Sequence, residues 1–432
     1  MQTENSKIAL HRKNPLGIWQ NAKERLSPLA WPLIEPTFTF SAKATVYTIG
    51  SCFARNIEEH LDLLGCTIPT LAFAVPREEW KGLRENGILN KYTPSSIYQD
   101  LSWAAGIYTR SDGFQPEDAD IFRFDVSNGK VIDLQLAGFT PVSVERFYER
   151  RKQIYHLTAS AFTADCVTMT LGLIETWMHK GVYVQQPPAS RELLQFANDF
   201  QFVVLDYETS YKMIHNSISL LQKLNPEVKV LITTSPVPME RTFTTDDVII
   251  ANMTSKSTLR TVARKIAEAF GGVDYFPSYE AVVMSPLVVT FNEDLIHVKD
   301  EFVGKIVSTL IANYFPETSE LAKIIQVCAA QLGAPNPSVE AFEALRRANP
   351  QIDSLSLSHL TVFLRVAWRL RDRNLARKIS EAILVQNARP HTTLRAIAHI
   401  WPRLGMQAEA RLFASDVLAK DPSNALAQSL ME

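Results

Sequence analysis

The sequence predicts a three-layer α/β/α domain with a parallel sheet, followed by an all-α region. Short β-favouring segments alternate with helical patterns over roughly the first three quarters of the 432 residues, and this alternation is typical of parallel sheets with helices on both faces. After about residue 317 the strand signals vanish and helix pairs follow one another. A chain of this length also favours more than one folding unit.

The first elements follow an N-terminal arm. Residues 1–40 are rich in proline and tryptophan, and we expect them to pack over the next domain. The β-favouring run at residues 45–49 predicts a strand, Gly50-Ser51 predicts a tight turn, and helical spacing from Phe53 to Leu64 predicts a helix that ends at Gly65.

Further strands of the same sheet are expected at Cys166–Leu171, Phe200–Asp206, Val228–Thr233 and Val273–Tyr275. Helical patterns follow at Tyr211–Leu224, Lys256–Phe270 and Lys299–Tyr314. Active sites in parallel sheets gather beyond the carboxyl ends of the strands. Ser51 would therefore meet Asp294 and His297 at one edge of a single domain, residues 41–316.

The C-terminal region, residues 317–432, predicts a stack of helix pairs. Its residues Leu370, Ala376 and Arg377 align with Leu404, Ala410 and Arg411 at an offset of 34 residues, the period of a tetratricopeptide-type repeat. Gly405 and Pro422 lie near the expected turns, and residues 319–347 would form an atypical preceding pair. Two interpretations remain open: a bundle that shields the first domain, or a surface that binds a protein partner.

Composition excludes several function classes. The formal net charge of −2 does not favour nucleic acid as a partner. Four scattered cysteines and nine dispersed histidines show neither metal-site nor disulfide-framework spacing. We therefore expect no metal. No phosphate-binding glycine loop occurs either, so we expect no cofactor. Without a signal-like segment or a run of about eighteen apolar residues, the expectation is a cytoplasmic protein with no membrane span.

Ser51 is the first candidate for chemistry. A serine after a glycine turn, at the start of a helix, lies near unpaired backbone N–H groups and the positive helix end. That position suits a nucleophile whose tetrahedral intermediate carries an oxyanion. The alternative is that Ser51 only caps the helix.

Asp294 and His297 are the second candidates. A carboxylate three residues before a histidine can hold one ring nitrogen, which leaves the other to act as a general base for a serine hydroxyl. A solvated loop is the alternative. Together the two motifs favour a catalytic site over the two alternatives, because they fall at opposite ends of one α/β pattern.

These residues belong to a longer resemblance. The string Thr48-Ile49-Gly50-Ser51-Cys52-Phe53-Ala54 resembles the motif that names the GSCFA domain family, and further matches lie at residues 170–177, 235–238, 255–260 and 275–280 and at Asp294 with His297. The resemblance covers about residues 45–314. The family is similar to the SGNH (GDSL-like) hydrolase superfamily, which implies a flavodoxin-like fold with Ser51 as nucleophile, His297 as general base and Asp294 as its orienting acid.

The resemblance also implies an oxyanion hole made by the Ser51 backbone N–H, a glycine and an asparagine. Gly172 fits the glycine, but the asparagine position falls on Ile174, which cannot donate. Gly87 and Asn90 are candidates on another loop, where an ordinary turn is the alternative.

Other residues have weaker signals. Glu175, Trp177 and His179 are candidates to line a substrate cleft, with a core role as the alternative. Lys256 and Arg260, one helical turn apart, would hold an anionic group, or form a solvated face or an ion pair. Tyr279 and Glu280 would position the loop that bears Asp294. Cys52 is either a thiolate at a helix N-terminus or an inert buried thiol.

The expected function is that of an SGNH-type esterase. Its substrate would be a small O-acyl ester, such as an O-acetylated carbohydrate, cleaved through an acyl-Ser51 intermediate. One alternative is an acyltransferase in polysaccharide assembly that uses a coenzyme A thioester as donor. The other is a non-catalytic glycan-binding module whose helical tail recruits a protein, and the missing donor at Ile174 favours it.

Overall fold

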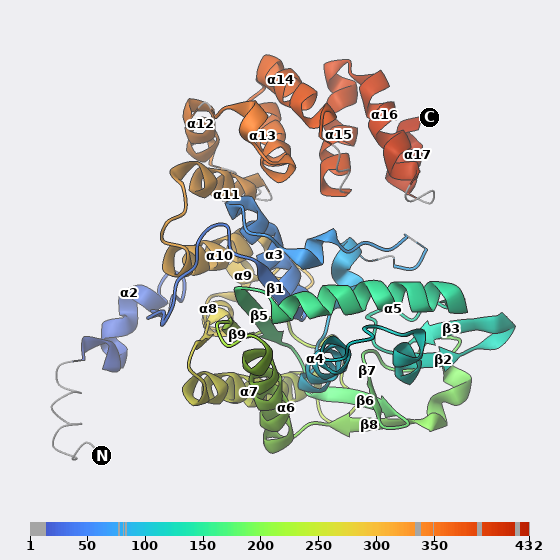
Figure 1. Ribbon diagram of the computed structural model, residues 1–432. Coiled ribbons are helices and arrows are strands. Elements are labelled where there is room, and N and C mark those ends of the chain that lie inside the picture. Colours follow the sequence, from blue (N-terminus) through green and yellow to red (C-terminus); the bar gives the residue numbers. More distant parts are fainter. Residues whose placement is uncertain are drawn as a thin grey trace.

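The computed structural model describes residues 14–76, 78–80, 82, 84–332, 338–348, 350–386, 391–419 and 424–431. It shows an α/β region built on a parallel sheet, followed by a helical region (Figure 1). Both coarse expectations from the sequence are thereby confirmed.

The central sheet has four parallel strands in the order β1-β5-β9-β10, with the bounds β1 (Val46–Gly50), β5 (Cys166–Leu171), β9 (Lys229–Thr234) and β10 (Val273–Tyr275). Every residue of β1 and β5 is buried, as expected where helices cover both faces. A single parallel bridge joins Thr45 to Thr67 on the other side of β1. These four strands confirm the expectations for their segments.

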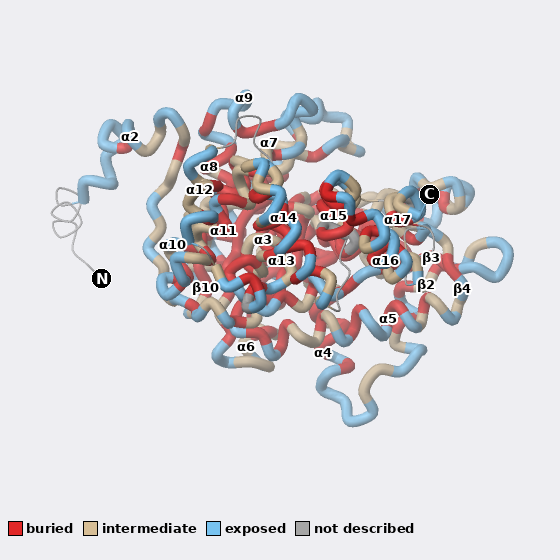
Figure 2. The backbone as a smooth tube through the Cα atoms, turned by 90° about the horizontal axis from the view of Figure 1, so that it is seen from above, coloured by how far each residue is buried: buried red, intermediate tan, exposed pale blue. Residues whose placement is uncertain are grey.

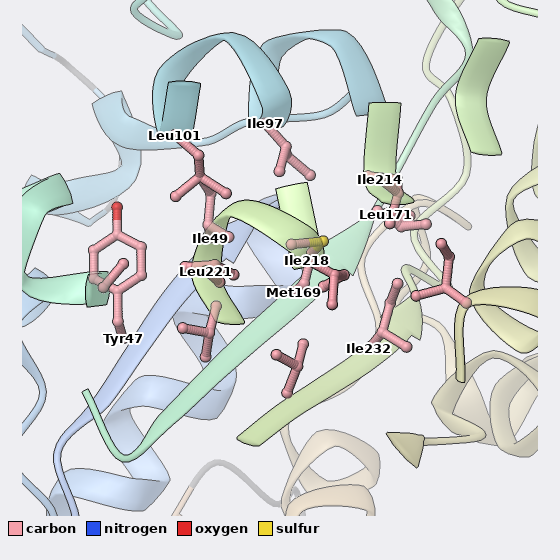
Figure 3. Close-up of a cluster of buried hydrophobic side chains, with 14 of the residues drawn as sticks. Tyr47, Ile49, Ile97, Leu101, Met169, Leu171, Ile214, Ile218, Leu221 and Ile232 are labelled. Carbon is pink, nitrogen blue, oxygen red and sulfur yellow. The ribbon is translucent and has the colours of Figure 1, made fainter. Parts of the chain in front are cut away.

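One face of the sheet is covered by three helices: α4 (Pro94–Tyr108), α6 (Tyr207–Leu224) and α7 (Val248–Ala269). Figure 3 shows apolar side chains of α4 and α6 beside Ile49, Met169 and Ile232 of the strands, and Leu259 and Val262 of α7 belong to the same cluster. The opposite face is covered by α3 (Cys52–Leu64) and α10 (Asp300–Tyr314), which pack against Val46, Cys166 and Leu231. Successive strand residues thus serve opposite cores.

The expected placement of Phe200–Asp206 in the parallel sheet is wrong. Strand β8 (Phe200–Val204) pairs antiparallel with β6 (Glu175–His179), which also pairs with β7 (Val182–Val184). The cause is a tight hairpin: Lys180 and Gly181 both have positive φ, 48° and 81°, as two-residue hairpin turns require. That turn leaves one edge of β6 free for β8.

Several elements had no clear signal in the sequence. They are α4, the long helix α5 (Val144–Ala159), and an antiparallel sheet of β2 (Arg123–Asp125), β3 (Lys130–Asp133) and β4 (Val142–Ser143). Short helices flank the carboxyl edge of the main sheet: α8 (Ser278–Val283) and α9 (Leu287–Thr290). The 3₁₀ helices are Pro15–Gly17, Trp19–Ala22, Pro69–Ala72, Glu85–Leu89, Pro116–Phe122, Ser127–Gly129, Ser160–Phe162, Leu194–Asp199 and Ile352–Ser354.

The helical region repeats with the offset seen in the sequence. Its helices are α11 (Glu320–Leu332), α12 (Val339–Ala348), α13 (Leu357–Arg369), α14 (Arg373–Leu384), α15 (His391–Leu404), α16 (Gln407–Leu418) and α17 (Ala425–Met431). The turn after α13 has Arg371 at φ 60°, and the turn after α15 has Gly405 at φ 76°. These turns lie 34 residues apart, like α14 and α16. Pro422 lies outside the described residues.

The helical region packs directly on the α/β region (Figure 1). Leu63 of α3 belongs to the apolar cluster of the C-terminal helices. Next to it, Ser358 donates a hydrogen bond to Asp62, and the ring of His359 bonds the Leu63 carbonyl. On α10, Gly304 lies so close to Ala330 that a β-carbon at Gly304 would stand 2.4 Å from the Ala330 Cβ.

The N-terminal segment is partly packed and partly exposed. Trp31 stacks on Phe302 with ring centroids 5.6 Å apart, and Thr37 bonds Asp274 through its N–H and hydroxyl, 2.8 and 2.7 Å. Before it, α2 (Lys23–Leu26) lies outside the body of the molecule (Figure 1). None of the described helices is long and apolar enough to cross a bilayer.

Candidate functional site

Ser51 lies between the end of β1 and the start of α3. Gly50 has φ 141°, and a β-carbon there would stand 2.3 Å from both the carbonyl oxygen and Oγ1 of Thr170, so only glycine fits. The Ser51 N–H donates to Thr170 Oγ1 at 2.8 Å. The Ser51 hydroxyl caps α3 by accepting from the Phe53 N–H at 3.3 Å and lies 3.2 Å from Thr170 Oγ1. Ser51 is only 2% exposed.

Gly172 lies against Ser51, as the resemblance implied. A β-carbon at Gly172 would stand 3.4 Å from the Ser51 Cβ and 2.8 Å from the Tyr92 carbonyl oxygen. The N–H groups of Gly172 and Leu173 both donate to that oxygen, at 3.0 and 2.7 Å. The N–H of Lys91 donates to the Gly50 carbonyl at 2.7 Å. The turn after β1, the turn after β5 and residues 91–92 therefore form one hydrogen-bonded unit.

Most of the predicted oxyanion donors already have partners. The Ser51 N–H donates to Thr170, and the Gly172 N–H donates to the Tyr92 carbonyl. The Gly87 N–H donates to the Arg84 carbonyl at 3.0 Å, inside a 3₁₀ helix. Asn90 is buried and donates from Nδ2 to the Tyr92 hydroxyl at 3.2 Å, while its Oδ1 has no partner. A substrate oxygen would have to displace one of these acceptors.

Asp294 and His297 form the predicted pair on the loop between α9 and α10. Asp294 Oδ2 lies 2.7 Å from His297 Nδ1, and Asp294 Oδ1 accepts the N–H groups of Ile296 and His297 at 2.9 and 3.0 Å. Leu295, between them, has φ 57°. These bonds, led by the one from His297, lower the pKa of Asp294 to about 2, so the carboxylate stays charged and orients the imidazole.

The loop leaves His297 open to solvent. Its side chain is 64% exposed, and the Asp294 side chain is 45% exposed. Ser51, by contrast, is buried. Among the hydrogen bonds of the described residues, none joins Ser51 to His297. The structure therefore assembles the Asp294–His297 pair and the Ser51–Gly172 pair, without a direct bond between them.

Lys256 is buried, which the sequence analysis did not predict. Its side chain is 1% exposed, and Nζ donates to the Gly172 carbonyl at 2.8 Å. No carboxylate pairs with it among the described residues. Burial is the main cause that lowers its pKa to about 7, and Cys52 opposes that shift. The expectation of a solvated face or an ion pair is wrong for Lys256.

The signal for Lys256 was available in the helical spacing. The residue lies three and seven positions before Leu259 and Ala263, which belong to the buried stripe of α7. The neighbouring Ser255 is buried as well and accepts the Ile174 N–H at 3.1 Å. For Arg260 the ion-pair expectation is confirmed, since its Nε lies 2.9 Å from Glu280 Oε1.

The three predicted cleft residues share one face of β6 but differ in environment. Glu175 accepts the Thr242 hydroxyl at 2.6 Å and the Phe243 N–H at 2.9 Å. The Trp177 ring lies 5.3 Å from that of Phe243. His179 is buried between the rings of Phe124 and Phe200, and burial lowers its pKa. His179 thus serves a small aromatic core.

The remaining candidates are structural in this geometry. Glu280 accepts from the Tyr275 hydroxyl at 2.7 Å, and the Tyr279 hydroxyl reaches Met253 Sδ at 3.9 Å. Cys52 is a free, half-buried thiol, and burial raises its pKa, so it carries no thiolate at neutral pH. Within the described ranges, no group of three potential metal ligands occurs.

Comparison with known proteins gives one family. Residues 45–310 match the model of the GSCFA family. No curated protein and no solved structure matches the chain. The matched range begins just before β1 and ends inside α10, so it contains Ser51, Gly172, Lys256, Asp294 and His297.

Proposed function

Because the chain belongs to the GSCFA family, we propose that its α/β region is an SGNH-type serine hydrolase. It cleaves an O-acyl ester, such as an O-acetyl group on a carbohydrate, through an acyl-Ser51 intermediate. His297 acts as general base, and Asp294 holds the imidazole in the productive tautomer.

The position of Ser51 in the sheet carries this proposal. If the bridge at Thr67 is counted as a reduced second strand, the strand order becomes 2-1-3-4-5, that of doubly wound flavodoxin-like folds. Ligands in such folds bind beyond the carboxyl ends of the strands, where the order reverses, between the first and third strands. Ser51 follows β1 and Gly172 follows β5 at that point.

The reaction divides into two transfers. The Ser51 hydroxyl gives its proton to the free ring nitrogen of His297, and its oxygen attacks the acyl carbon, so that the carbonyl oxygen becomes an oxyanion. When the intermediate collapses, the leaving alkoxide takes the proton from His297. Water repeats the sequence to release the acid and restore Ser51.

This chemistry requires Ser51 and His297 to approach each other. Catalytic hydrogen bonds often become short only when substrate is bound, and the exposed loop of Asp294 and His297 is held mainly by its own bonds. The missing Ser51–His297 bond is also the observation that favours a non-catalytic glycan-binding module.

Hydrolysis of p-nitrophenyl acetate separates the two candidates. We expect Ser51→Ala to lower kcat/KM on the order of a thousandfold, because the nucleophile is lost. Cys52→Ala, one residue away, is the matched control and should stay within a few-fold of the unmodified protein. A fluorophosphonate should label the protein at Ser51. Equal rates for Ser51→Ala and the unmodified protein would favour the binding module.

An acyltransferase would use the same acyl-Ser51 intermediate with a sugar hydroxyl in place of water. Its donor would be a thioester such as acetyl-coenzyme A. Consumption of acetyl-coenzyme A with and without a glycan acceptor tests this version, and turnover that does not depend on the acceptor counts against it.

We extend the proposal to the tail, whose helices resemble a tetratricopeptide stack. Two observations support this extension: α14 and α16 are offset by 34 residues, and the turns at Arg371 and Gly405 share a positive φ.

A further inference from the structure

Exposed apolar side chains gather around the loop of Asp294 and His297. Of the twenty-six large hydrophobic side chains exposed among the described residues, eleven lie between residues 243 and 295, a stretch of about an eighth of the chain. The most exposed define what we call the apolar collar: Ile249, Ile250, Met253, Leu287, Val288 and Leu295, between 51% and 79% exposed. Exposed apolar side chains that gather in one region mark interaction sites, whereas exposed apolar residues that are scattered singly are normal on protein surfaces.

Contacts and chain connectivity link the segments that carry the collar. Met253 of α7 contacts Tyr279 of α8 at 3.9 Å, and α9 follows α8 directly in the chain. Lys299 Nζ donates to the Val288 carbonyl at 2.6 Å, which ties α9 to the end of the His297 loop. Figure 2 shows α9 as exposed backbone at the margin of the molecule, on the side where α7 and α8 also lie.

One residue of the collar lies within the loop of Asp294 and His297. Leu295 is 59% exposed and stands between Asp294 and His297 in the chain. A protein seated over the collar would close access to His297. A lipid surface would instead bring an ester to it.

The chemistry of the collar also points to lipid. Five of its six residues are aliphatic, whereas the centres of protein interfaces are enriched in aromatic residues, methionine and arginine, and leucine and valine are under-represented among their strongest contacts. The segments 240–253 and 283–299, which carry the collar, hold five acidic residues and two basic ones. An anionic bilayer attracts basic surfaces, so this charge selects an uncharged or zwitterionic surface.

We propose that the apolar collar inserts into a zwitterionic or uncharged lipid surface and that the substrate is an amphiphile whose ester is presented there. This inference rests on the proposed function for the ester, but lipid binding itself does not require the chemistry.

Sedimentation with phosphatidylcholine vesicles tests the collar, using the full chain carrying Ser51→Ala so that chemistry plays no part. We expect binding that is weakened when part of the lipid is phosphatidylglycerol. The double substitution Leu287→Ser with Val288→Ser should lower the partition coefficient about tenfold or more, because two side chains lose their transfer into the apolar phase.

A matched pair of exposed residues provides the control. Leu412 and Val385 are 61% and 79% exposed, and Leu287 and Val288 are 60% and 79% exposed. Leu412→Ser with Val385→Ser should leave vesicle binding unchanged, and thermal melting should show all variants folded. The proposal is overturned if the protein does not bind vesicles, if both pairs of substitutions weaken binding equally, or if the collar pair instead abolishes a dimer seen by light scattering. Absence of esterase activity in the unmodified protein, with vesicle binding intact, would contradict the proposed function but not the lipid binding of the collar.

Discussion

At the scale of single residues, local motifs determine the environment of Ser51, Asp294 and His297, whereas long-range packing determines that of Lys256. Gly50-Ser51 and Asp294 with His297 are local motifs, and the structure forms the local geometry expected of each. The burial of Lys256 depends on how α7 packs on the sheet, and on the turn after β5 that offers the Gly172 carbonyl. Long-range contacts of this kind leave only a weak periodic trace in the sequence.

The buried amine of Lys256 leads to a pH-dependent stability. Its pKa falls from 10.5 to about 7 on folding. Below pH 7 both the folded and the unfolded chain bind the proton, so Lys256 does not make the unfolding free energy depend on pH. Between pH 7 and pH 10.5 only the unfolded chain binds it, and stability rises with pH. Replacing Lys256 by methionine removes this slope.

We expect the unfolding free energy of the unmodified protein, minus that of Lys256→Met, to rise by about 2 kcal/mol between pH 7 and pH 9. Urea denaturation at the two pH values measures the difference. Lys265→Met on the same helix is the control, since the Glu268 partner raises the pKa of Lys265 and both of its states stay protonated over that range. A flat Lys256 difference would mean that the amine is charged in the folded protein.

At the scale of elements, the parallel strands were predictable because each is a short β-favouring run followed by turn residues. Strand β8 was misplaced because its own sequence does not reveal its partner. Its pairing depends on the hairpin at Lys180-Gly181, whose turn signal lies twenty residues earlier. The small sheet of β2, β3 and β4 joins strands of two to four residues, too short for a periodic pattern.

The junction of β1 and α3 depends on one glycine. In Gly50→Ala the new methyl group would meet the Thr170 carbonyl at 2.3 Å in a backbone conformation that alanine disfavours. We expect a loss of about 3 kcal/mol or more in unfolding free energy, or an insoluble protein. Gly106→Ala, in the exposed part of α4 with nothing within 4 Å of the new methyl group, should instead stabilise by about 0.5–1 kcal/mol. Equal stability of the two variants in urea denaturation would contradict this role of Gly50.

At the scale of the whole molecule, the helical region and the α/β region share an interface. The last helical turn of α3 supplies Asp62 and Leu63 as hydrogen-bond partners for α13, and α10 lies close to α11 at Gly304. The 34-residue offset predicted the internal repeat of the tail. It did not predict this docking, because the face of α3 that is buried against the tail shows the same helical spacing as a face buried against the sheet.

Removal of residues 317–432 tests what the docking does. We expect the truncated chain to aggregate, because Leu63 loses its apolar cover and α10 loses its contact with α11 at Gly304. Solubility after centrifugation and binding of a hydrophobic dye measure the effect. The substitution Leu63→Lys is the control and should act in opposite directions in the two chains. It should raise the solubility of the truncated chain, where the side chain faces water. It should lower the stability of the full chain, where Leu63 is 7% exposed. A truncated chain as soluble and as active as the full protein would instead mark the tail as a platform for a partner.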